Sequence, residues 1–279
     1  MQNLYWWQAL NPAIYLVSIL PSVGVWLLVQ PEGKAQFALI IATFAVILAQ
    51  HAINLLNDVA DWKLGADVEK WDSWVRFHNQ NLSVATLHGW ISFIGSGFLG
   101  LATLVWIEKL WILLIALPLV GLGYLYNSGE KPLSYSRSGE WVTAICYGGV
   151  FACLWFVSSQ KLELSIVLGS LAFGSLAVAL LLSHQPRQIE TDKRANKQTF
   201  AVRFGAKKTH QAVRVLFLIF FTAWNYALFI SESNVMLVMA SLLIACFVFG
   251  HSLCKIPNPK QLLCSASLPF SVMLAIVQL

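Results

Sequence analysis

The chain has 279 residues, of which 58% are hydrophobic and only 11% are charged. Ordinary soluble proteins have roughly 45–50% apolar and about 25% charged residues. A soluble fold of this length has too little interior to hide that much apolar surface. The composition therefore excludes a soluble globular protein and indicates a polytopic membrane protein. The formal net charge of +5 does not indicate nucleic-acid binding, because the basic residues follow the expected membrane topology.

Nine apolar segments are each long enough to cross a bilayer as a helix, which takes about 20 residues. They are expected near residues 13–30, 36–57, 85–107, 110–127, 140–158, 163–184, 212–231, 234–254 and 261–279. Three of the connections between them are long or polar, namely 58–84, 128–139 and 185–211. The sequence thus predicts an all-α protein with nine transmembrane helices.

The basic residues predict the orientation of these helices. Of the 18 Lys and Arg residues, 15 lie in the connections after the second, fourth, sixth and eighth segments or at the start of the seventh. The opposite side has Lys34, Lys109 and Lys161. Because cytoplasmic loops are enriched in Lys and Arg, we expect a cytoplasmic N-terminus, an external C-terminus and an inner-membrane location. All three polar connections then face the cytoplasm.

The first polar connection begins with a stripe of carboxylates and amides. Residues at i, i+3, i+4 and i+7 of a helix share one face, and this spacing relates Asn54, Asn57, Asp58 and Asp61, with Asp67 following. Like charges on one face repel each other unless a cation lies between them. Oxygen ligands of this kind suit a hard cation such as Mg²⁺. The alternative is a solvated loop just outside a membrane helix.

The third polar connection mixes acids and bases after the sixth segment. It contains Arg187, Glu190, Asp192, Lys193, Arg194, Lys197 and Arg203. A diphosphate site needs acids that hold a bridging metal and bases that neutralise the remaining phosphate charge. The alternative is a loop whose charges contact anionic lipid head groups. Two polar clusters on the same side of the membrane favour a shared site. In the middle connection, Lys131 could reach a phosphate and the tyrosines could border a substrate. The alternative for the tyrosines is an interfacial aromatic belt.

Three stretches carry a family resemblance: NLLNDVADWKLGAD, GYLYNSGEKPLSYSRSGE and IETDKRANKQTFAVRFG. In this order and on alternate loops they resemble the UbiA superfamily of intramembrane prenyltransferases. Within it they are most similar to the 1,4-dihydroxy-2-naphthoate prenyltransferases of menaquinone and phylloquinone synthesis. The resemblance implies a single membrane-embedded domain over residues 1–279, with helices around a central cavity. It also implies Mg²⁺-dependent transfer from an allylic polyprenyl diphosphate to an aromatic quinone precursor.

The resemblance implies roles for particular residues. The residues that match the two acidic motifs, and are therefore expected to be catalytic, are Asn57, Asp58, Asp61, Asp67 and Asp192. The expected metal ligands are Asn57, Asp61, Asp67, Asp192 and Gln188. The expected diphosphate-binding residues are Lys131, Arg187 and Lys197, with Thr199 completing the K-x-T pattern of the second motif.

The chain departs from the family pattern at three positions. Gln188 stands where most members have the first aspartate of the second motif, Asn196 replaces a glycine, and Asn11 replaces an arginine. An amide oxygen can coordinate Mg²⁺ or hold a coordinated water, but it brings no charge. His184 lies one helical turn before Gln188, so it is either a further ligand or an ordinary interface residue.

The implied mechanism is ionisation of the donor followed by attack of the acceptor ring on the allylic cation, coupled to loss of CO₂ from dihydroxynaphthoate. Aromatic faces would stabilise the cation, and the candidates are Trp62, Phe93, Trp106, Tyr147, Phe151, Phe173 and Trp224. Two alternatives remain open. One keeps the fold and donor with another acceptor, such as 4-hydroxybenzoate or homogentisate. The other is a transporter or a catalytically silent protein, which Gln188 supports.

Overall fold

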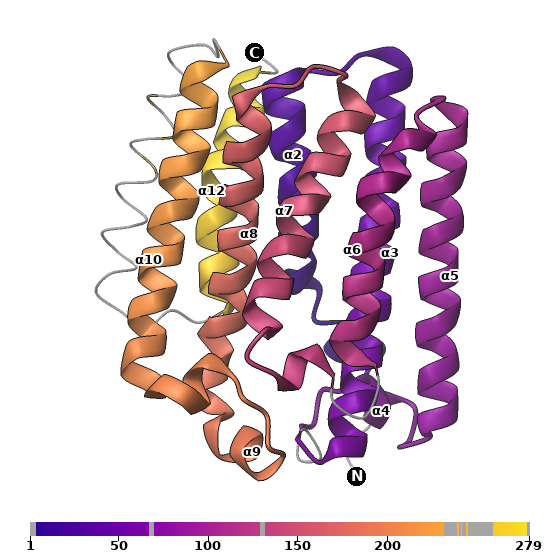
Figure 1. Cartoon of the computed structure of the whole chain (residues 1–279), viewed down its shortest axis with the longest axis vertical. Coiled ribbons are helices and arrows are strands. Elements are labelled where there is room, and N and C mark those ends of the chain that lie inside the picture. Colours follow the sequence, from indigo (N-terminus) through magenta and orange to yellow (C-terminus); the bar gives the residue numbers. More distant parts are fainter. Residues whose placement is uncertain are drawn as a thin grey trace.

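The computed structural model describes residues 4–66, 70–128, 132–231 and 259–277, together with residues 239, 241 and 244. Every regular element in these ranges is helical (Figure 1), which confirms the all-α prediction. The α-helices are α1 (Trp6–Leu10), α2 (Leu16–Val29), α3 (Gly33–Leu64), α4 (Trp74–Phe77), α5 (Leu82–Trp106), α6 (Leu113–Asn127), α7 (Gly139–Ser158), α8 (Leu164–His184), α9 (Ile189–Arg194), α10 (Phe200–Ile230) and α12 (Pro259–Val277). The short 3₁₀ helices are η1 (Pro12–Tyr15), η2 (Leu110–Ile112), η3 (Leu133–Tyr135) and η4 (Gln185–Arg187).

Among the described residues, seven helical stretches are long and apolar enough to span a bilayer, and they match the first seven predicted segments. The ninth predicted segment corresponds to α12, whose apolar part is the shorter stretch Gln261–Ala275. The eighth, 234–254, lies outside the described residues except for residues 239, 241 and 244. The protein is therefore a multi-pass membrane protein, and the count of nine stays a prediction.

The long helices run side by side along the long axis of the molecule (Figure 1). The short helices α4 and α9 lie at the same end of the bundle, and α12 ends at the opposite end (Figure 1). Two of the three polar connections therefore meet at one end, although they are separated by more than a hundred residues in sequence.

The helices pack through an aromatic core and small residues. Phe151 of α7 stacks on Phe173 of α8 with ring centroids 5.2 Å apart, and Trp224 of α10 lies 4.8 Å from Phe270 of α12. A Cβ atom at Gly169 would lie 2.1 Å from the Phe151 ring, so only glycine permits this approach of α8 to α7. Small residues serve this purpose widely in membrane helices. Large apolar side chains cover the outside instead, as lipid contact requires, and Phe98 is 74% exposed.

A kink in α10 separates its polar start from its apolar span. Gly205 has φ 82° and ψ 164° inside the helix, a backbone conformation that residues with a side chain rarely adopt. The residues from Phe200 to Phe204 therefore form a separate helical turn before the span. This turn begins directly after Thr199. Its position therefore determines where Lys197 and Thr199 of the third polar connection lie.

Candidate active site

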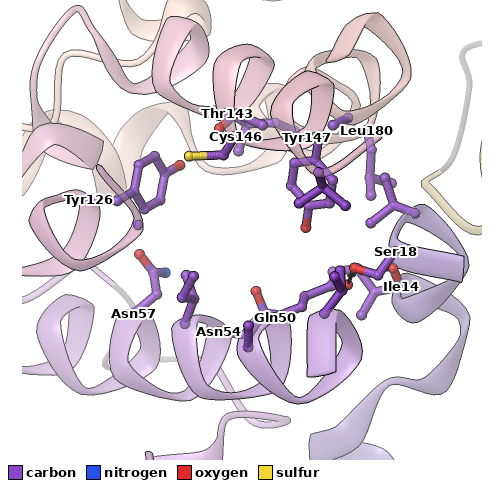
Figure 2. Close-up of a pocket in the computed structure, with 18 of the residues that line it drawn as sticks. Ile14, Ser18, Gln50, Asn54, Asn57, Tyr126, Thr143, Cys146, Tyr147 and Leu180 are labelled. Carbon is purple, nitrogen blue, oxygen red and sulfur yellow. Dashed lines mark hydrogen bonds between the residues drawn. The ribbon is translucent and has the colours of Figure 1, made fainter. Parts of the chain in front are cut away.

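A cavity of about 690 Å³ lies among α2, α3, α5, α6, α7 and α8. Gln50, Asn54 and Asn57 of α3 face Tyr126, Thr143, Cys146 and Tyr147 across its opening (Figure 2). The cavity extends along the bundle, since its lining includes Leu104 and Leu113 near the end opposite α4. That part is apolar. At the other end its lining includes charged and amide side chains: Asn57, Asp58, Asp61, Lys70, Asp72, Glu140, Gln188, Asp192 and Lys197.

Asp61 is the centre of the polar end. Its side chain is 2% exposed, and both carboxylate oxygens lie 3.0 Å from the Lys197 Nζ atom, which belongs to the third polar connection. The Tyr135 hydroxyl of the middle connection donates to Oδ1 at 2.7 Å, and the Asn57 amide of α3 donates to Oδ2 at 2.8 Å. All three polar connections of the sequence therefore meet at one carboxylate.

Lys197 is held as a cation at this point. Burial by itself lowers the pKa of Lys197, but the negative charges of Asp61 and Asp192 outweigh this effect, and its pKa lies above the ordinary value. Its ammonium group also lies 4.9 Å from the centroid of the Tyr135 ring. The cavity thus has a fixed positive charge beside its carboxylates at neutral pH.

Asp192 reaches the same cavity from α9. Its Oδ2 accepts a hydrogen bond from the Thr199 hydroxyl at 3.0 Å, and its backbone oxygen accepts from the Lys197 amide at 2.8 Å. The turn between them needs a left-handed residue, and Asn196 has φ 56°. Asparagine adopts this conformation more readily than other residues with a side chain. Asn196 therefore supplies the left-handed residue of this turn.

Asp58 has a different position from its neighbours in the stripe. Its Oδ1 lies 2.8 Å from the Lys70 Nζ atom, and its Oδ2 accepts the Trp74 backbone amide at 2.8 Å. Both oxygens of this buried carboxylate therefore anchor the connection between α3 and α4. The helical spacing that groups Asp58 with Asp61 does not reveal this, because the partners lie 12 and 16 residues away in a loop.

We expect Asp58→Asn to lower the free energy of unfolding by about 1.5–3 kcal/mol, the range for hydrogen bonds to charged groups. The amide can still accept the Trp74 amide but loses the ion pair with Lys70. Thermal unfolding in detergent measures the effect, with exposed Glu190→Gln as the control. An unchanged Tm in Asp58→Asn would contradict the anchoring role.

The other expected site residues divide into three groups. Gln188 and His184 line the cavity, in agreement with a shared site. Arg187 is exposed on η4 and is absent from the described lining, so the structure does not bring it to the diphosphate position that the resemblance implies. Arg187 is the last residue of η4, and its side chain is exposed. Asp67 and Lys131 lie outside the described residues.

Glu140 is a half-buried site residue that ends the stretch GYLYNSGEKPLSYSRSGE, and the sequence analysis gave it no role. Its Oε1 accepts the Phe200 backbone amide at 2.7 Å and the Gln185 side-chain amide at 3.3 Å, and Arg203 lies 3.2 Å from Oε2. Gln185 in turn accepts the Ala201 amide at 3.2 Å. Glu140 and Gln185 therefore accept hydrogen bonds from two of the free backbone amides at the start of α10, those of Phe200 and Ala201. These bonds fix the turn after Lys197. Its place at the end of that stretch was the available signal.

The oxygen donors fit a metal that arrives with a substrate. Among the described residues, no three His, Cys, Asp or Glu side chains gather closely enough to hold a metal ion. The described lining offers the carboxylates of Asp61 and Asp192 with the amides of Asn57 and Gln188. Mg²⁺ usually keeps several waters and binds one or two carboxylates together with substrate phosphates. This donor set therefore fits Mg²⁺ bound to a diphosphate better than a preformed metal cage.

The fold and cavity define a multi-pass helical membrane protein with a long apolar cavity that ends in opposed acids and a lysine. Residues 17–271 match the model of the UbiA prenyltransferase family, and the chain belongs to this family. The resemblance drawn from the three motifs is thereby confirmed.

Curated relatives are similar over most of the chain. A 1,4-dihydroxy-2-naphthoate octaprenyltransferase of Bacillus subtilis is 28% identical over 212 residues, which cover 72% of this chain and 66% of that protein. A 2-carboxy-1,4-naphthoquinone phytyltransferase of Synechocystis is 29% identical over 247 residues, 85% of this chain and 78% of that protein. A 1,4-dihydroxy-2-naphthoate octaprenyltransferase of Haemophilus influenzae is 28% identical over 261 residues, which cover 86% of this chain and 83% of that protein.

Solved structures of archaeal relatives show the same fold. A UbiA homologue from Archaeoglobus fulgidus bound to GPP and Mg²⁺ has a TM-score of 0.68 at 17% identity, covering 98% of this chain and 99% of its own. The apo structure of a UbiA homologue from Aeropyrum pernix has a TM-score of 0.70 at 14% identity, and the match covers 96% of this chain and 98% of that homologue. At these identities the comparison establishes the fold.

Proposed function

We propose that this prenyltransferase transfers a polyprenyl group from an allylic diphosphate to 1,4-dihydroxy-2-naphthoate, a step of menaquinone or phylloquinone synthesis. The names of the three curated relatives support the naphthoate class of acceptor. The observation that carries the proposal is the meeting of Asp61, Asp192 and Lys197 at one end of a mostly apolar cavity. An amphiphilic donor needs this combination of a charged end and an apolar channel.

The donor diphosphate binds between Asp61 and Asp192 in this proposal. Asp61, Asp192, Asn57 and Gln188 would hold Mg²⁺, with Asp67 as a further ligand. When bound, Mg²⁺ supplies positive charge that offsets the charge developing on the leaving diphosphate oxygens. The Mg²⁺-bound structure of the A. fulgidus homologue supports a divalent metal. Lys197 contributes a second positive charge, and the Asn57 amide at 2.8 Å keeps the Asp61 carboxylate oriented.

The donor tail leaves the cavity towards the lipid between α5 and α6. Leu101 of α5 and Leu117 of α6 both line the cavity, and they are 45% and 61% exposed. In this proposal a long isoprenoid extends between these two residues into the bilayer. This route explains why the enzyme acts within a membrane.

The allylic cation is shielded by aromatic side chains at the cavity wall. Of the candidates from the sequence, Tyr147 lines the cavity, whereas Phe151, Phe173 and Trp224 pack in the core. Tyr126 and Tyr147 stand on the face opposite Asn57 and Gln50 (Figure 2). A cation held over such rings gains roughly 0.5–2 kcal/mol each.

The orientation follows from the positive-inside pattern. We place the enzyme in the inner membrane with the N-terminus and the active site on the cytoplasmic side and the C-terminus outside. Protease accessibility of tags at the two ends in right-side-out vesicles tests this placement.

The test of the function is an assay of membranes that contain the protein, with Mg²⁺, a labelled polyprenyl diphosphate and a panel of aromatic acceptors. We expect transfer to dihydroxynaphthoate that EDTA abolishes and added Mg²⁺ restores. Transfer to 4-hydroxybenzoate or homogentisate instead would replace the acceptor but keep the reaction class. A folded protein that prenylates no acceptor would refute the proposal in favour of a silent or transport protein.

We expect Gln188→Asp to leave transfer intact or to raise it, because the change adds a carboxylate at a position that lines the cavity. The extra charge should strengthen Mg²⁺ binding, so the Mg²⁺ concentration for half-maximal activity should fall. A Mg²⁺ titration of the variant beside the wild type measures this. Complete loss of activity would mean that the amide has a specific role.

A further inference from the structure

A continuous chain of four hydrogen-bonding side chains leads away from the cavity beside the diphosphate site. It begins at Tyr15 of η1, whose hydroxyl lies 2.8 Å from the Nδ1 atom of His51 on α3. His51 Nε2 lies 3.3 Å from Nε2 of His88 on α5. His88 Nδ1 lies 3.1 Å from Nε2 of His78, which follows α4. Tyr15 is 7% exposed and lines the cavity, whereas His78 is half-buried in the loop at the end of the bundle.

The atoms used by each ring make this chain directional. His51 and His88 each use both ring nitrogens, one towards the cavity and one away from it. A neutral imidazole has one donor and one acceptor nitrogen. If Tyr15 donates to His51, then His51 must donate to His88 and His88 to His78. When a proton enters at Tyr15 and one proton moves along every link, each bond reverses its direction and His78 becomes an imidazolium cation.

Aromatic side chains enclose the chain. The Trp74 ring packs edge-on against His51 at 4.9 Å and His88 at 5.2 Å, and Phe77 packs against His78 at 5.1 Å. Trp74 is itself positioned by the bond from its backbone amide to Asp58. The Asp58 carboxylate acts electrostatically on Tyr15, and Asp58 itself pairs with Lys70. Burial and the neighbouring His88 lower the pKa of His78, so its ring is neutral at neutral pH.

The proposed prenyl transfer does not use these four residues. Lys197 is a cation and cannot accept a proton, and Asp61 already accepts bonds from three donors. Three histidines suggest a metal site as an alternative, but they are arranged in a line, and no group of three possible ligands in the described part of the chain is compact enough for a metal.

We propose that Tyr15, His51, His88 and His78 form a proton relay that removes the hydroxyl proton of the aromatic acceptor during prenyl transfer and later returns it. Tyr15 is the catalytic residue that touches the acceptor hydroxyl, and the three histidines pass the proton between Tyr15 and the loop. The role of the relay rests on the proposed function, because a phenolic acceptor supplies the proton.

The steps balance in atoms and electrons. The acceptor O–H bond breaks, its proton passes to Tyr15, and one proton advances along each link to His78, while the electron pair stays on the acceptor oxygen. The ring carbon that bears the carboxylate then bonds to C1 of the prenyl group, using electrons of the naphtholate. The C1–O bond breaks, and the diphosphate leaves with the electron pair of that bond. The resulting β-keto carboxylate loses CO₂, which returns the electron pair to the ring and its oxygen. The naphtholate oxygen then takes the proton back through the relay.

The kinetic test uses the full-length protein in lipid nanodiscs, with variants Tyr15→Phe and His88→Ala. General acid–base catalysis contributes roughly 10²–10⁴-fold, and water can replace part of it, so we expect kcat to fall roughly 10- to 100-fold. The KM for the prenyl diphosphate should not change. Added imidazole should restore activity to His88→Ala, whereas thiophene, a ring of similar size without nitrogen, should not. His210→Ala, on α10 outside the described cavity lining, is the control and should keep full activity.

A second readout does not depend on turnover. In protein labelled with ¹⁵N-histidine, Tyr15→Phe should shift the ring nitrogen signals of His51 and also those of His88, because the tautomers are linked. Movement of the His51 signals alone would overturn the relay, as would unchanged kcat in both variants or a loss that imidazole does not rescue. A wild-type protein that prenylates no phenolic acceptor would overturn the proposed function and the role of the relay in it. The NMR result would still report whether the hydrogen-bonded chain exists.

Discussion

Asp61→Asn is expected to lower the kcat of prenyl transfer by roughly 10²–10³-fold, the cost typical of losing one group that stabilises developing charge. The amide keeps the shape of the carboxylate and can still accept the Tyr135 hydroxyl. It loses the charge that would bind Mg²⁺ and that holds Lys197 at 3.0 Å. The diphosphate would then lose both its metal and the fixed position of its lysine. Initial rates with labelled donor at several Mg²⁺ concentrations measure the effect.

Glu190→Gln is the matched control for this prediction. Glu190 lies on α9 two residues before Asp192, but its side chain is 82% exposed and pairs with Lys193. Removal of its charge should leave kcat within about twofold, because exposed ion pairs contribute little. Asp61→Asn with near wild-type kcat would show that this carboxylate is not needed for the chemistry, even if the protein belongs to the family.

Lys197→Met is expected to reduce both activity and stability. The ion pair with Asp61 is buried, with the side chains 13% and 2% exposed. Removal of one partner from such a pair typically costs about 3–5 kcal/mol, because the other charge stays buried without compensation. The variant should also lose positive charge at the diphosphate. We therefore expect a clearly lower Tm in detergent and a kcat reduced roughly 10²-fold or more.

The double variant Asp61→Asn with Lys197→Met separates these two effects. The unpaired charge is absent from the double variant, so its stability should recover most of what Lys197→Met loses. Its activity should stay as low as that of the single variants. Recovery of neither stability nor activity would indicate that Lys197 acts through contacts other than Asp61. Recovery of activity would exclude a role for this pair in catalysis.

The sequence predicted the helical fold and the main feature of the site because both depend on strong local patterns. Apolar runs identify membrane helices whatever their neighbours are, and the first seven segments match helices in the structure. Residues Asn57 and Asp61 at i and i+4 lie on one face and do contact each other at 2.8 Å. A shared site for the first and third polar connections was expected from the sequence, whereas the pairing of Asp61 with Lys197, 136 residues apart, was not predicted.

Side-chain directions in the connections could not be predicted from the sequence. Arg187 and Gln188 are adjacent, yet Gln188 lines the cavity and Arg187 is exposed. The short helix η4 ends there, and no periodic pattern indicates which residue turns inward. Asp58 lies on the same stripe as Asp61 but anchors Lys70 and Trp74, because the loop returns to it. The relay residues Tyr15, His51 and His88 lie 36 and 37 residues apart in sequence, which no short motif covers.

The central claim is that Asp61 and Asp192 together bind one magnesium diphosphate. A structure of the protein with Mg²⁺ and a non-cleavable prenyl thiodiphosphate tests it most directly. The account predicts a diphosphate between these two carboxylates, with Lys197 Nζ roughly 3 Å from a phosphate oxygen and the prenyl chain along the apolar part of the cavity. A diphosphate bound elsewhere, or held by one of the two aspartates without the other, would contradict it.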